Sequence, residues 1–320
     1  MCEKSDVTQN DPTVDSAVDP TVSVNADPAA TAAVQSAAAV QSAQSVHPKQ
    51  SAPLPTDVPV VAVVLAAGFG TRFDPDNPKQ LVSVGGKEIV LWSIEAFEHN
   101  PLVSDIIVVV NPRVHEQVES LIINNGMSKV RMVIEGGAER SDSTQIALQT
   151  LADAGIPDDA KVLIHDAVRP FVEQSAIRGC IETLNQFRAA TVAVPSTDTV
   201  LLTQDLGDRK IISSVPERPD TFRAQTPQAF RFSTIREAYA KAVGDPDFHP
   251  TDDTRVVVDY LPGTPVAIVA GADTNLKITT LADIPVAENI AANLTQGMSK
   301  EEARARMHAM LSGALDQMRR

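Results

Sequence analysis

Several features that define whole classes of protein are scarce or missing in this sequence. Its 320 residues include only two cysteines, Cys2 and Cys180, too few for a disulfide framework and without the spacing of a zinc site. No apolar run approaches the ~20 residues that span a bilayer. The N-terminus lacks the basic and apolar regions of a secretory signal. We therefore expect a cytoplasmic protein, and we expect Cys180 to be a buried core thiol.

Positive charge is also scarce. Lysine and arginine number 27 against 41 acidic residues, which gives a formal net charge of −14. This balance argues against a nucleic-acid groove, whose footprint is basic. It does not argue against a phosphorylated small molecule, because a few local cations decide that binding. The motifs GxSxG and HExxH are absent, so a hydrolase lacks support.

The first 57 residues differ in composition from the rest of the chain. They contain no aromatic residue and no glycine, and they are rich in Ala, Ser, Val, Asp and Pro. Such a segment buries too little apolar surface to offset the entropy lost on ordering. We predict a disordered extension at 1–57, a folded domain at 58–295, and a helical extension at 296–320.

From Val58 onward, β-branched apolar runs alternate with stretches whose apolar residues recur at helical spacing. We predict strands at 60–65, 105–110, 130–134, 161–165, 191–195 and 266–270. We predict helices at 88–100, 115–124, 141–154, 175–188, 227–242 and 281–294. The alternation predicts an α/β fold with a doubly wound, mostly parallel, Rossmann-like sheet. Ligands of such sheets bind beyond the carboxyl ends of the strands.

The segment 196–226 breaks this alternation. A turn sequence, DLGD at 205–208, separates two short β-like runs at 199–203 and 210–215. These runs predict a β-hairpin arm that protrudes from the sheet. Because an arm with apolar residues on both strands needs a cover, we predict a homodimer joined through residues 199–222.

The stretch 60–79, VVAVVLAAGFGTRFDPDNPK, carries the strongest functional signal. Its apolar start predicts a strand buried on both faces. The small residues after it allow backbone N–H groups to close on a phosphate; they are Ala66, Ala67, Gly68 and Gly70. Arg72 and Lys79 add two cations, so the stretch predicts a polyphosphate site. Its spacing fits neither a Walker loop nor the dinucleotide fingerprint GxGxxG.

Later motifs fall at the predicted strand ends. GGAERSDS at 136–143 opens a helix, and its N–H groups and serines serve either a ligand or ordinary helix capping. Asp166, in HDAVRP, ends a strand and is placed to bind Mg²⁺ directly or through water. Arg169 either reaches a phosphate or anchors Asp166. His165 is expected to be a structural histidine.

Together these motifs resemble those of one family, the 2-C-methyl-D-erythritol 4-phosphate cytidylyltransferases of the non-mevalonate isoprenoid pathway. LAAGFGTRF with PKQ, GGAERSDS, HDAVRP, DTV of the arm, RAQTPQAF, TDD and NLKIT all occur in order. The resemblance covers residues 58–295. It implies the nucleotidyltransferase fold and transfer of CMP from CTP to the phosphate of methylerythritol phosphate, with release of pyrophosphate and Mg²⁺ as cofactor.

The resemblance also implies roles for individual residues. The nucleotide site would consist of Ala66, Ala67, Gly68, Gly70, Gly137 and Ser143. Arg72 and Lys79 would stabilise charge at the transferring phosphorus. Lys277 and Arg218 would position the sugar phosphate, with Arg218 supplied by the partner's arm and Arg223 as the competing candidate. Further contacts with substrate or metal would come from Asp166, Arg169, Thr199, Thr226 and Thr251.

Two other functions stay open from the sequence. A cytidylyltransferase acting on ribitol 5-phosphate would share the CTP loop and differ in the polyol pocket. A non-catalytic nucleotide-binding regulator is a more distant alternative. The cations Arg72, Lys79 and Lys277, together with Asp166, speak against the regulator.

Overall fold

The computed structural model of the chain describes residues 58–68, 78–248 and 250–296. The predicted extension 1–57 lies outside these residues, as do Gly70, Arg72 and all of the predicted extension 296–320 except Gln296. Among the described helices, none is long and apolar enough to cross a membrane.

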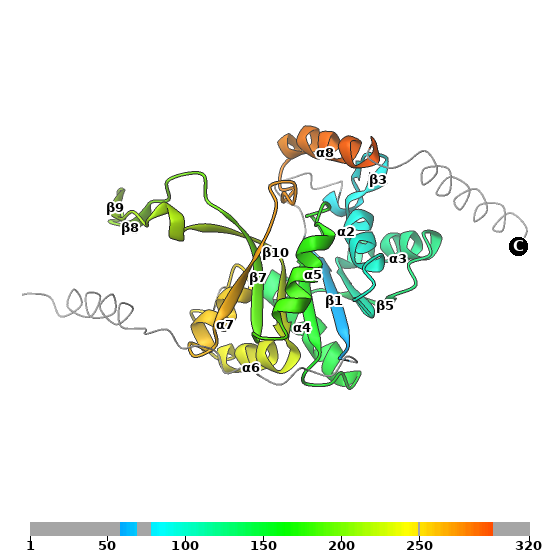
Figure 1. Cartoon of the computed structure of the whole chain (residues 1–320), viewed down its shortest axis with the longest axis horizontal. Coiled ribbons are helices and arrows are strands. Elements are labelled where there is room, and N and C mark those ends of the chain that lie inside the picture. Colours follow the sequence, from blue (N-terminus) through cyan, green and yellow to red (C-terminus); the bar gives the residue numbers. More distant parts are fainter. Residues whose placement is uncertain (1–57, 69–77, 249, 297–320) are drawn as a thin grey trace, which may run out of the picture. The chain divides into compact units, whose positions relative to one another are not determined.

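A sheet of seven strands forms the centre of the fold, in the order β11-β7-β10-β6-β1-β4-β5 (Figure 1). The strands are β1 (Val60–Ala66), β4 (Asp105–Val110), β5 (Val130–Glu135), β6 (Lys161–Asp166), β7 (Ala189–Pro195), β10 (Phe222–Arg231) and β11 (Val266–Ala270). All neighbours are parallel except β10, which runs antiparallel to both β6 and β7. The predicted mostly parallel sheet is confirmed.

Helices cover both faces of this sheet (Figure 1). One face packs against α2 (Ile89–Glu98), α3 (His115–Asn124) and α5 (Gln174–Thr183); the other packs against α4 (Arg140–Asp153), α6 (Phe232–Ala242) and α7 (Asp253–Tyr260). Successive residues of a strand point to opposite faces. In β1, Ala62 and Val64 therefore enter the first core and Val61 and Val63 the second. This explains why the β1 sequence is apolar without alternation.

One predicted helix is wrong over part of its length. The helix predicted at 227–242 begins only at Phe232, because residues 222–231 form the antiparallel strand β10. Pro227 has no N–H to donate, and it lies where the pairing with β7 shifts register, between Ala224 and Gln228. The partners of β10 lie on β6 and β7, so its strand character depends on contacts that no local pattern carries.

The other differences are smaller. Helix α5 ends at Thr183, and the helix predicted at 281–294 consists of a short 3-10 turn, Leu281–Asp283, followed by α8 (Ile284–Gln296). A small hairpin of β2 (Ser83–Val84) and β3 (Lys87–Glu88) was not predicted. It packs with α8 around a third apolar cluster that includes Val84 and Ile278.

The predicted arm is present as β8 (Leu202–Asp205) and β9 (Lys210–Ser214), which form a separate two-stranded antiparallel sheet (Figure 1). Every residue of both strands is exposed. Leu202 is 50% exposed and Ile212 is 59% exposed, although both are apolar. Within this chain, the described residues leave the arm's apolar side chains in solvent.

Candidate active site

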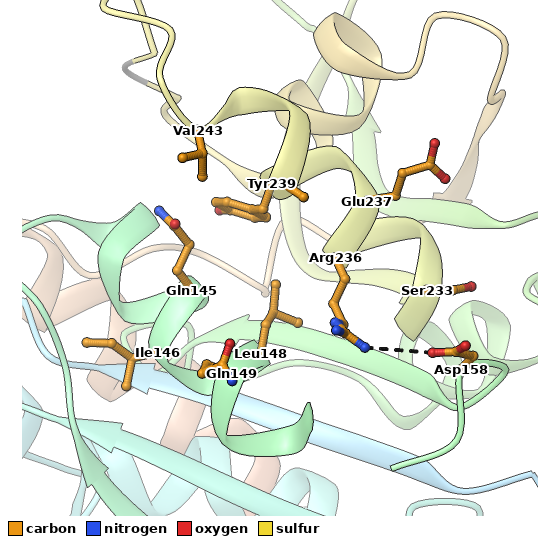
Figure 2. A pocket seen from close by; sticks show the side chains of 11 residues that line it. Gln145, Ile146, Leu148, Gln149, Asp158, Ser233, Arg236, Glu237, Tyr239 and Val243 are labelled. Atoms are coloured by element: carbon orange, nitrogen blue, oxygen red, sulfur yellow. Dashed lines mark ion pairs between the residues drawn. The ribbon is translucent and has the colours of Figure 1, made fainter. Parts of the chain in front are cut away.

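Several hollows open on the surface of the described residues, and two of them are candidates for the site. The larger, about 650 Å³, lies between α4 and α6, where Arg236 and Asp158 form an ion pair of 3.7 Å (Figure 2). None of the described residues singled out from the sequence lines it. The smaller, about 260 Å³, opens at the carboxyl ends of β1 and β6. We take the smaller cleft as the site, because the predicted residues meet there.

The predicted residues that line this cleft are Ala66, Ala67, Gly68, Lys79, Gly137, Ser143, Asp166 and Lys277. They come from five separate parts of the chain: the end of β1 with the turn after it, the 3-10 turn Lys79–Leu81, the start of α4, the end of β6, and the segment that follows β11. A parallel sheet brings these parts together because the carboxyl ends of its strands meet at one edge.

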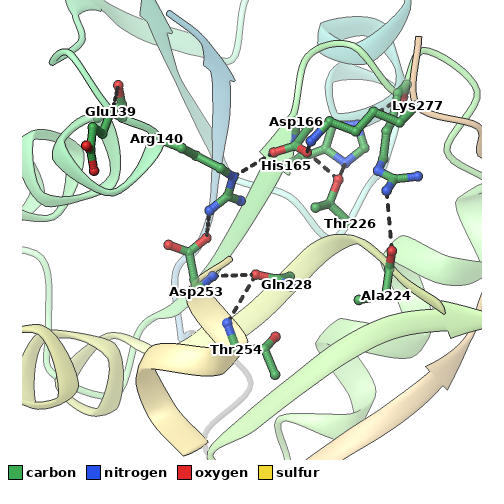
Figure 3. Close-up of polar contacts among 12 residues, drawn as sticks. Glu139, Arg140, His165, Asp166, Ala224, Thr226, Gln228, Asp253, Thr254 and Lys277 are labelled. Atoms are coloured by element: carbon green, nitrogen blue, oxygen red, sulfur yellow. Dashed lines mark hydrogen bonds and ion pairs between the residues drawn. The ribbon is translucent and has the colours of Figure 1, made fainter. Parts of the chain in front are cut away.

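Asp166, the last residue of β6, lies at the centre of a charged network (Figure 3). Its Oδ1 is 2.9 Å from Arg140 Nε, and its Oδ2 is 2.8 Å from Lys277 Nζ. Burial by itself would raise the pKa of Asp166. The two cations outweigh burial and hold that pKa well below its usual range. Asp166 is therefore ionised at neutral pH, and each of its oxygens already faces a cation.

Arg140 is a site residue that the sequence predictions missed. Besides Asp166 it contacts Asp253, the first residue of α7, with 2.7 Å between Nη1 and Oδ2. Asp253 is fully buried, and its other oxygen accepts from the Tyr239 hydroxyl at 2.7 Å. Burial lowers the pKa of Arg140, but the carboxylates of Asp253 and Asp166 raise it by more than burial lowers it, so the net shift is upward. Arg140 thus ties the start of α4 to β6 and α7.

Close backbone approach explains the two glycines before α4. A Cβ on Gly136 would lie 2.4 Å from the Cβ of Ala67, and one on Gly137 would lie 2.2 Å from that of Asp142. These separations are too short for any side chain. The Gly137 N–H donates to Ser143 Oγ at 3.2 Å, while Glu139 and Asp142 form the capping box of α4. Gly136 therefore lets the start of α4 pack directly on the turn after β1, and Gly137 leaves room for the side chain of Asp142.

Comparison with known proteins identifies the family. The sequence profile of the 2-C-methyl-D-erythritol 4-phosphate cytidylyltransferases matches residues 60–293. The chain belongs to this family. A curated 2-C-methyl-D-erythritol 4-phosphate cytidylyltransferase of Bifidobacterium longum (strain DJO10A) is 71% identical over 273 residues, which cover 85% of this chain and 94% of the relative. The chain is thus a nucleotidyltransferase enzyme.

Two further relatives, one of the same family and one with a ribitol-related activity, place this assignment in context. The crystal structure of the 4-diphosphocytidyl-2C-methyl-D-erythritol synthase of Anaerococcus prevotii DSM 20548 has a TM-score of 0.63 at 26% identity, covering 72% of this chain and 95% of that chain. A bifunctional ribulose 5-phosphate reductase/CDP-ribitol pyrophosphorylase of Haemophilus influenzae is 34% identical over 230 residues, covering 72% of this chain and 48% of the relative. The Bifidobacterium relative is far more similar than the ribitol-related one.

Thr226 and His165 lie behind Asp166 in this cytidylyltransferase (Figure 3). The Asp166 N–H donates to Thr226 Oγ1 at 3.1 Å, and that hydroxyl lies 2.9 Å from His165 Nδ1. His165 Nε2 lies 3.0 Å from the Arg169 carbonyl oxygen, which only accepts. Nε2 therefore carries the proton, and Nδ1 accepts from Thr226. The Thr226 hydroxyl is therefore engaged within the protein. The substrate contact predicted for Thr226 stays a prediction.

This arrangement predicts a pH-dependent stability. Burial lowers the pKa of His165 to about 4, so the folded state keeps the ring neutral where the unfolded chain protonates it. The contribution of the neutral His165 ring to the free energy of unfolding is complete above the unfolded-state pKa of about 6.5. It is lost as the pH falls from there to about 4, and the total loss is roughly 3 kcal/mol. Urea unfolding measured across this range should show the loss. His165→Gln should flatten the slope, and the exposed control His99→Gln should keep it; equal slopes in all three proteins would contradict the prediction.

Arg169 anchors the segment that carries Lys277. Its Nη1 donates to the Asn275 carbonyl at 2.8 Å, and its Nη2 donates to the Ala224 carbonyl at 3.3 Å. The sequence left two roles open for Arg169, contact with a phosphate or a direct anchor of Asp166. These two hydrogen bonds do not reach Asp166. Arg169 instead joins the NLKIT segment to β10, two residues before Lys277.

The remaining predicted residues that the structure describes lie outside the cleft of their own chain. Arg218 Nη2 donates to Thr199 Oγ1 at 3.2 Å at the base of the arm, where both are exposed. The competing candidate Arg223 forms an exposed ion pair of 2.8 Å with Asp273. Thr251 is exposed just before α7, and it is Asp253 of the same motif that reaches the site through Arg140. Neither Arg218 nor Thr251 lines the described cleft.

The predicted Mg²⁺ can be tested against the residues present. Among the described residues, no group of three or more His, Cys, Asp or Glu side chains could hold a metal. Asp166 is a single carboxylate, and both its oxygens already face cations. Mg²⁺ commonly keeps several waters and binds one or two carboxylates plus substrate phosphates. The site therefore fits an ion that would arrive with a triphosphate, and Asp166 is the residue that would meet it through water.

Proposed function

We propose that this chain transfers CMP from CTP to 2-C-methyl-D-erythritol 4-phosphate, with release of pyrophosphate. The observation that carries the proposal is the meeting of Lys79, Lys277 and Asp166 around the small-residue turn after β1. The family membership supports the same reaction, because the relative with 71% identity is named for it.

In this proposal the triphosphate of CTP lies along Ala66–Gly68, which lines the cleft together with residues at the start of α4. A helix N-terminus and a nest of N–H groups both favour anions. Lys79 meets the α-phosphate of the cytidylyl group that is transferred. Arg72, which follows the turn in sequence, is proposed as its partner. The nucleoside would lie near Gly137 and Ser143.

The second substrate would bind beside Lys277. An oxygen of its phosphate attacks the α-phosphorus of CTP, a new P–O bond forms, and the bond to the bridging oxygen of the β-phosphate breaks, so that pyrophosphate leaves. The attacking oxygen is already anionic, and no general base is required. The work left to the protein is to bring two polyanions together and to neutralise the charge that grows at the phosphorus. Asp166 contributes by fixing the ammonium of Lys277, 2.8 Å away.

We also propose Mg²⁺ as the cofactor. When bound, it neutralises charge on the triphosphate. Asp166 is the residue proposed to meet the ion, and it would do so through water because both of its oxygens already contact cations. We place the enzyme in the cytoplasm, since both substrates are charged and do not cross a bilayer unaided.

The arm supports a proposed homodimer. An isolated two-stranded hairpin is marginally stable in water, and the exposed apolar residues of β8 and β9 need a partner surface. A second copy of the chain would supply that surface. Arg218 and Thr199, at the base of the arm, would then face the partner's cleft.

A substitution on the arm tests this dimer. Ile212→Asp puts a charge on a residue that is 59% exposed in the single chain. We expect light scattering at micromolar concentration to change from a dimer to a monomer, with a parallel loss of activity. The matched control is Ile123→Asp on α3, at a residue that is 70% exposed and outside the arm. A monomeric parent protein, or an unchanged dimer in Ile212→Asp, would exclude the proposed interface.

The function is tested by pyrophosphate release with purified protein and CTP, with and without Mg²⁺. Methylerythritol 4-phosphate and ribitol 5-phosphate are compared as acceptors, because the ribitol-related relative is 34% identical. Release with the first acceptor alone supports the proposal. Release with the second alone moves the enzyme to polyol-nucleotide synthesis, and release with neither favours a nucleotide-binding regulator.

A further inference from the structure

The side chain of Gln80 packs against the small-residue turn, at the lining of the cleft, and is almost fully buried, at 1% exposure. Its amide nitrogen donates to the Ala66 carbonyl at 2.7 Å and to the Gly68 carbonyl at 2.6 Å. A primary amide has two N–H donors, so the turn uses both of them. Gln80 thus joins the end of β1 to the 3-10 turn that carries Lys79.

A second amide completes the pattern. Asn111, which follows β4 and is 5% exposed, donates from Nδ2 to the Ala67 carbonyl at 3.2 Å. Its Oδ1 is fixed in turn by the Arg113 N–H at 3.0 Å. The consecutive carbonyls of Ala66, Ala67 and Gly68 are therefore all held by buried side-chain amides.

The consequence follows from peptide geometry. In a trans peptide, the carbonyl and the N–H of the same plane point in opposite directions. The Ala66 carbonyl held by Gln80 therefore turns the Ala67 N–H away from Gln80, and the Ala67 carbonyl held by Asn111 turns the Gly68 N–H away from Asn111. Ala66, Ala67 and Gly68 line the cleft, so its opening lies against this backbone. Donors fixed before the substrate arrives stabilise phosphate charge without reorganisation.

We propose that Gln80, assisted by Asn111, is a positioning residue for the cytidylyl transfer. Its amide holds the carbonyls of the turn so that the N–H groups face the triphosphate, and it holds Lys79 in register with them. This inference rests on the proposed function for the identity of the ligand. The amide donors carry the role, because Gln80 Oε1 has no hydrogen-bond partner among the described residues.

Two substitutions of similar size separate the donor from the acceptor. Gln80→Glu replaces the amide nitrogen with an oxygen that faces two carbonyl oxygens, and Gln80→Met removes both polar atoms. We expect each variant to bind CTP more weakly in calorimetry without acceptor, and to lose about a hundredfold in kcat/KM, the scale of a misplaced reacting group. Gln149→Met, on an exposed glutamine of α4, makes the same chemical change away from the site and should behave as the parent protein.

The pH profile distinguishes positioning from mere support of the fold. A protonated glutamic acid offers one O–H donor, so the activity of Gln80→Glu relative to the parent should rise as the pH is lowered from about 8 to about 6. Gln80→Met should show no such recovery. Full activity in Gln80→Glu, or a loss that follows only the folded fraction at every pH, overturns the proposal. If the parent protein binds CTP but transfers to neither acceptor, the proposed function fails, while the binding comparison still decides the role of Gln80.

Discussion

Replacing Lys79 with alanine is expected to lower kcat by a factor of about 30 to 1,000, equivalent to ~2–4 kcal/mol of transition-state stabilisation. Lys79 lines the cleft beside the small-residue turn and opens the 3-10 turn Lys79–Leu81. In the proposed reaction, the negative charge that Lys79 meets increases as the cytidylyl group is transferred. Its loss should therefore act on kcat more than on the binding of CTP, measured by calorimetry without acceptor.

Two control variants accompany Lys79→Ala: one keeps the positive charge at position 79, and the other removes a lysine away from the cleft. Lys79→Arg keeps the cation and should retain more activity than the alanine variant. Lys241→Ala removes a half-exposed lysine of α6, which pairs with Glu237 at the i,i+4 spacing, and should leave kcat unchanged. An unchanged kcat in Lys79→Ala, with only weaker CTP binding, would show that Lys79 acts on the ground state.

The sequence predicted those parts of the site whose signal is local. The apolar strand 60–65, the small residues after it and Asp166 at the end of β6 are each marked by a few neighbouring residues. The parallel sheet then brings them to one edge. Knowledge of the fold class was therefore enough to predict that Lys79, Asp166 and Lys277 would meet, and they line one cleft.

The parts that were missed depend on distant partners. In the sequence, Arg140 is only one residue of a segment typical of helix capping, GGAERSDS. Its partner Asp253 is 113 positions away. The strand β10 is specified by β6 and β7 on either side of it. Gln80 was visible in the motif PKQ, but its role follows only from the carbonyls that it reaches. A sequence pattern identifies residue types and spacing, whereas these contacts require the folded chain.

The proposed dimer would supply a part of the site that one chain does not. Arg218 contacts Thr199 in its own arm and does not line the described cleft. Its predicted role in positioning the sugar phosphate therefore requires the arm of a second copy. This makes the Ile212→Asp variant informative about catalysis as well as assembly, since both should fail together.

Replacing Arg140 with methionine is expected to have the largest effect on stability. The change leaves the fully buried Asp253 without its cation and removes one of the two cations at Asp166. Removing one partner of a buried ion pair typically costs about 3–5 kcal/mol, because the remaining charge stays buried without compensation. Urea unfolding at neutral pH measures the loss, and pyrophosphate release should fall because Asp166 then faces Lys277 alone.

Two further variants separate burial from charge. Arg131→Met breaks an ion pair with Asp105 in which the arginine side chain is 58% exposed, and it should cost no more than about 1 kcal/mol. Asp253→Asn combined with Arg140→Met removes the uncompensated charge and should recover part of the lost stability, because the buried group is then neutral. Activity should not return in this double variant, since Asp166 still lacks its second cation. Equal costs for Arg140→Met and Arg131→Met would mean that the buried network adds nothing beyond an ordinary surface pair.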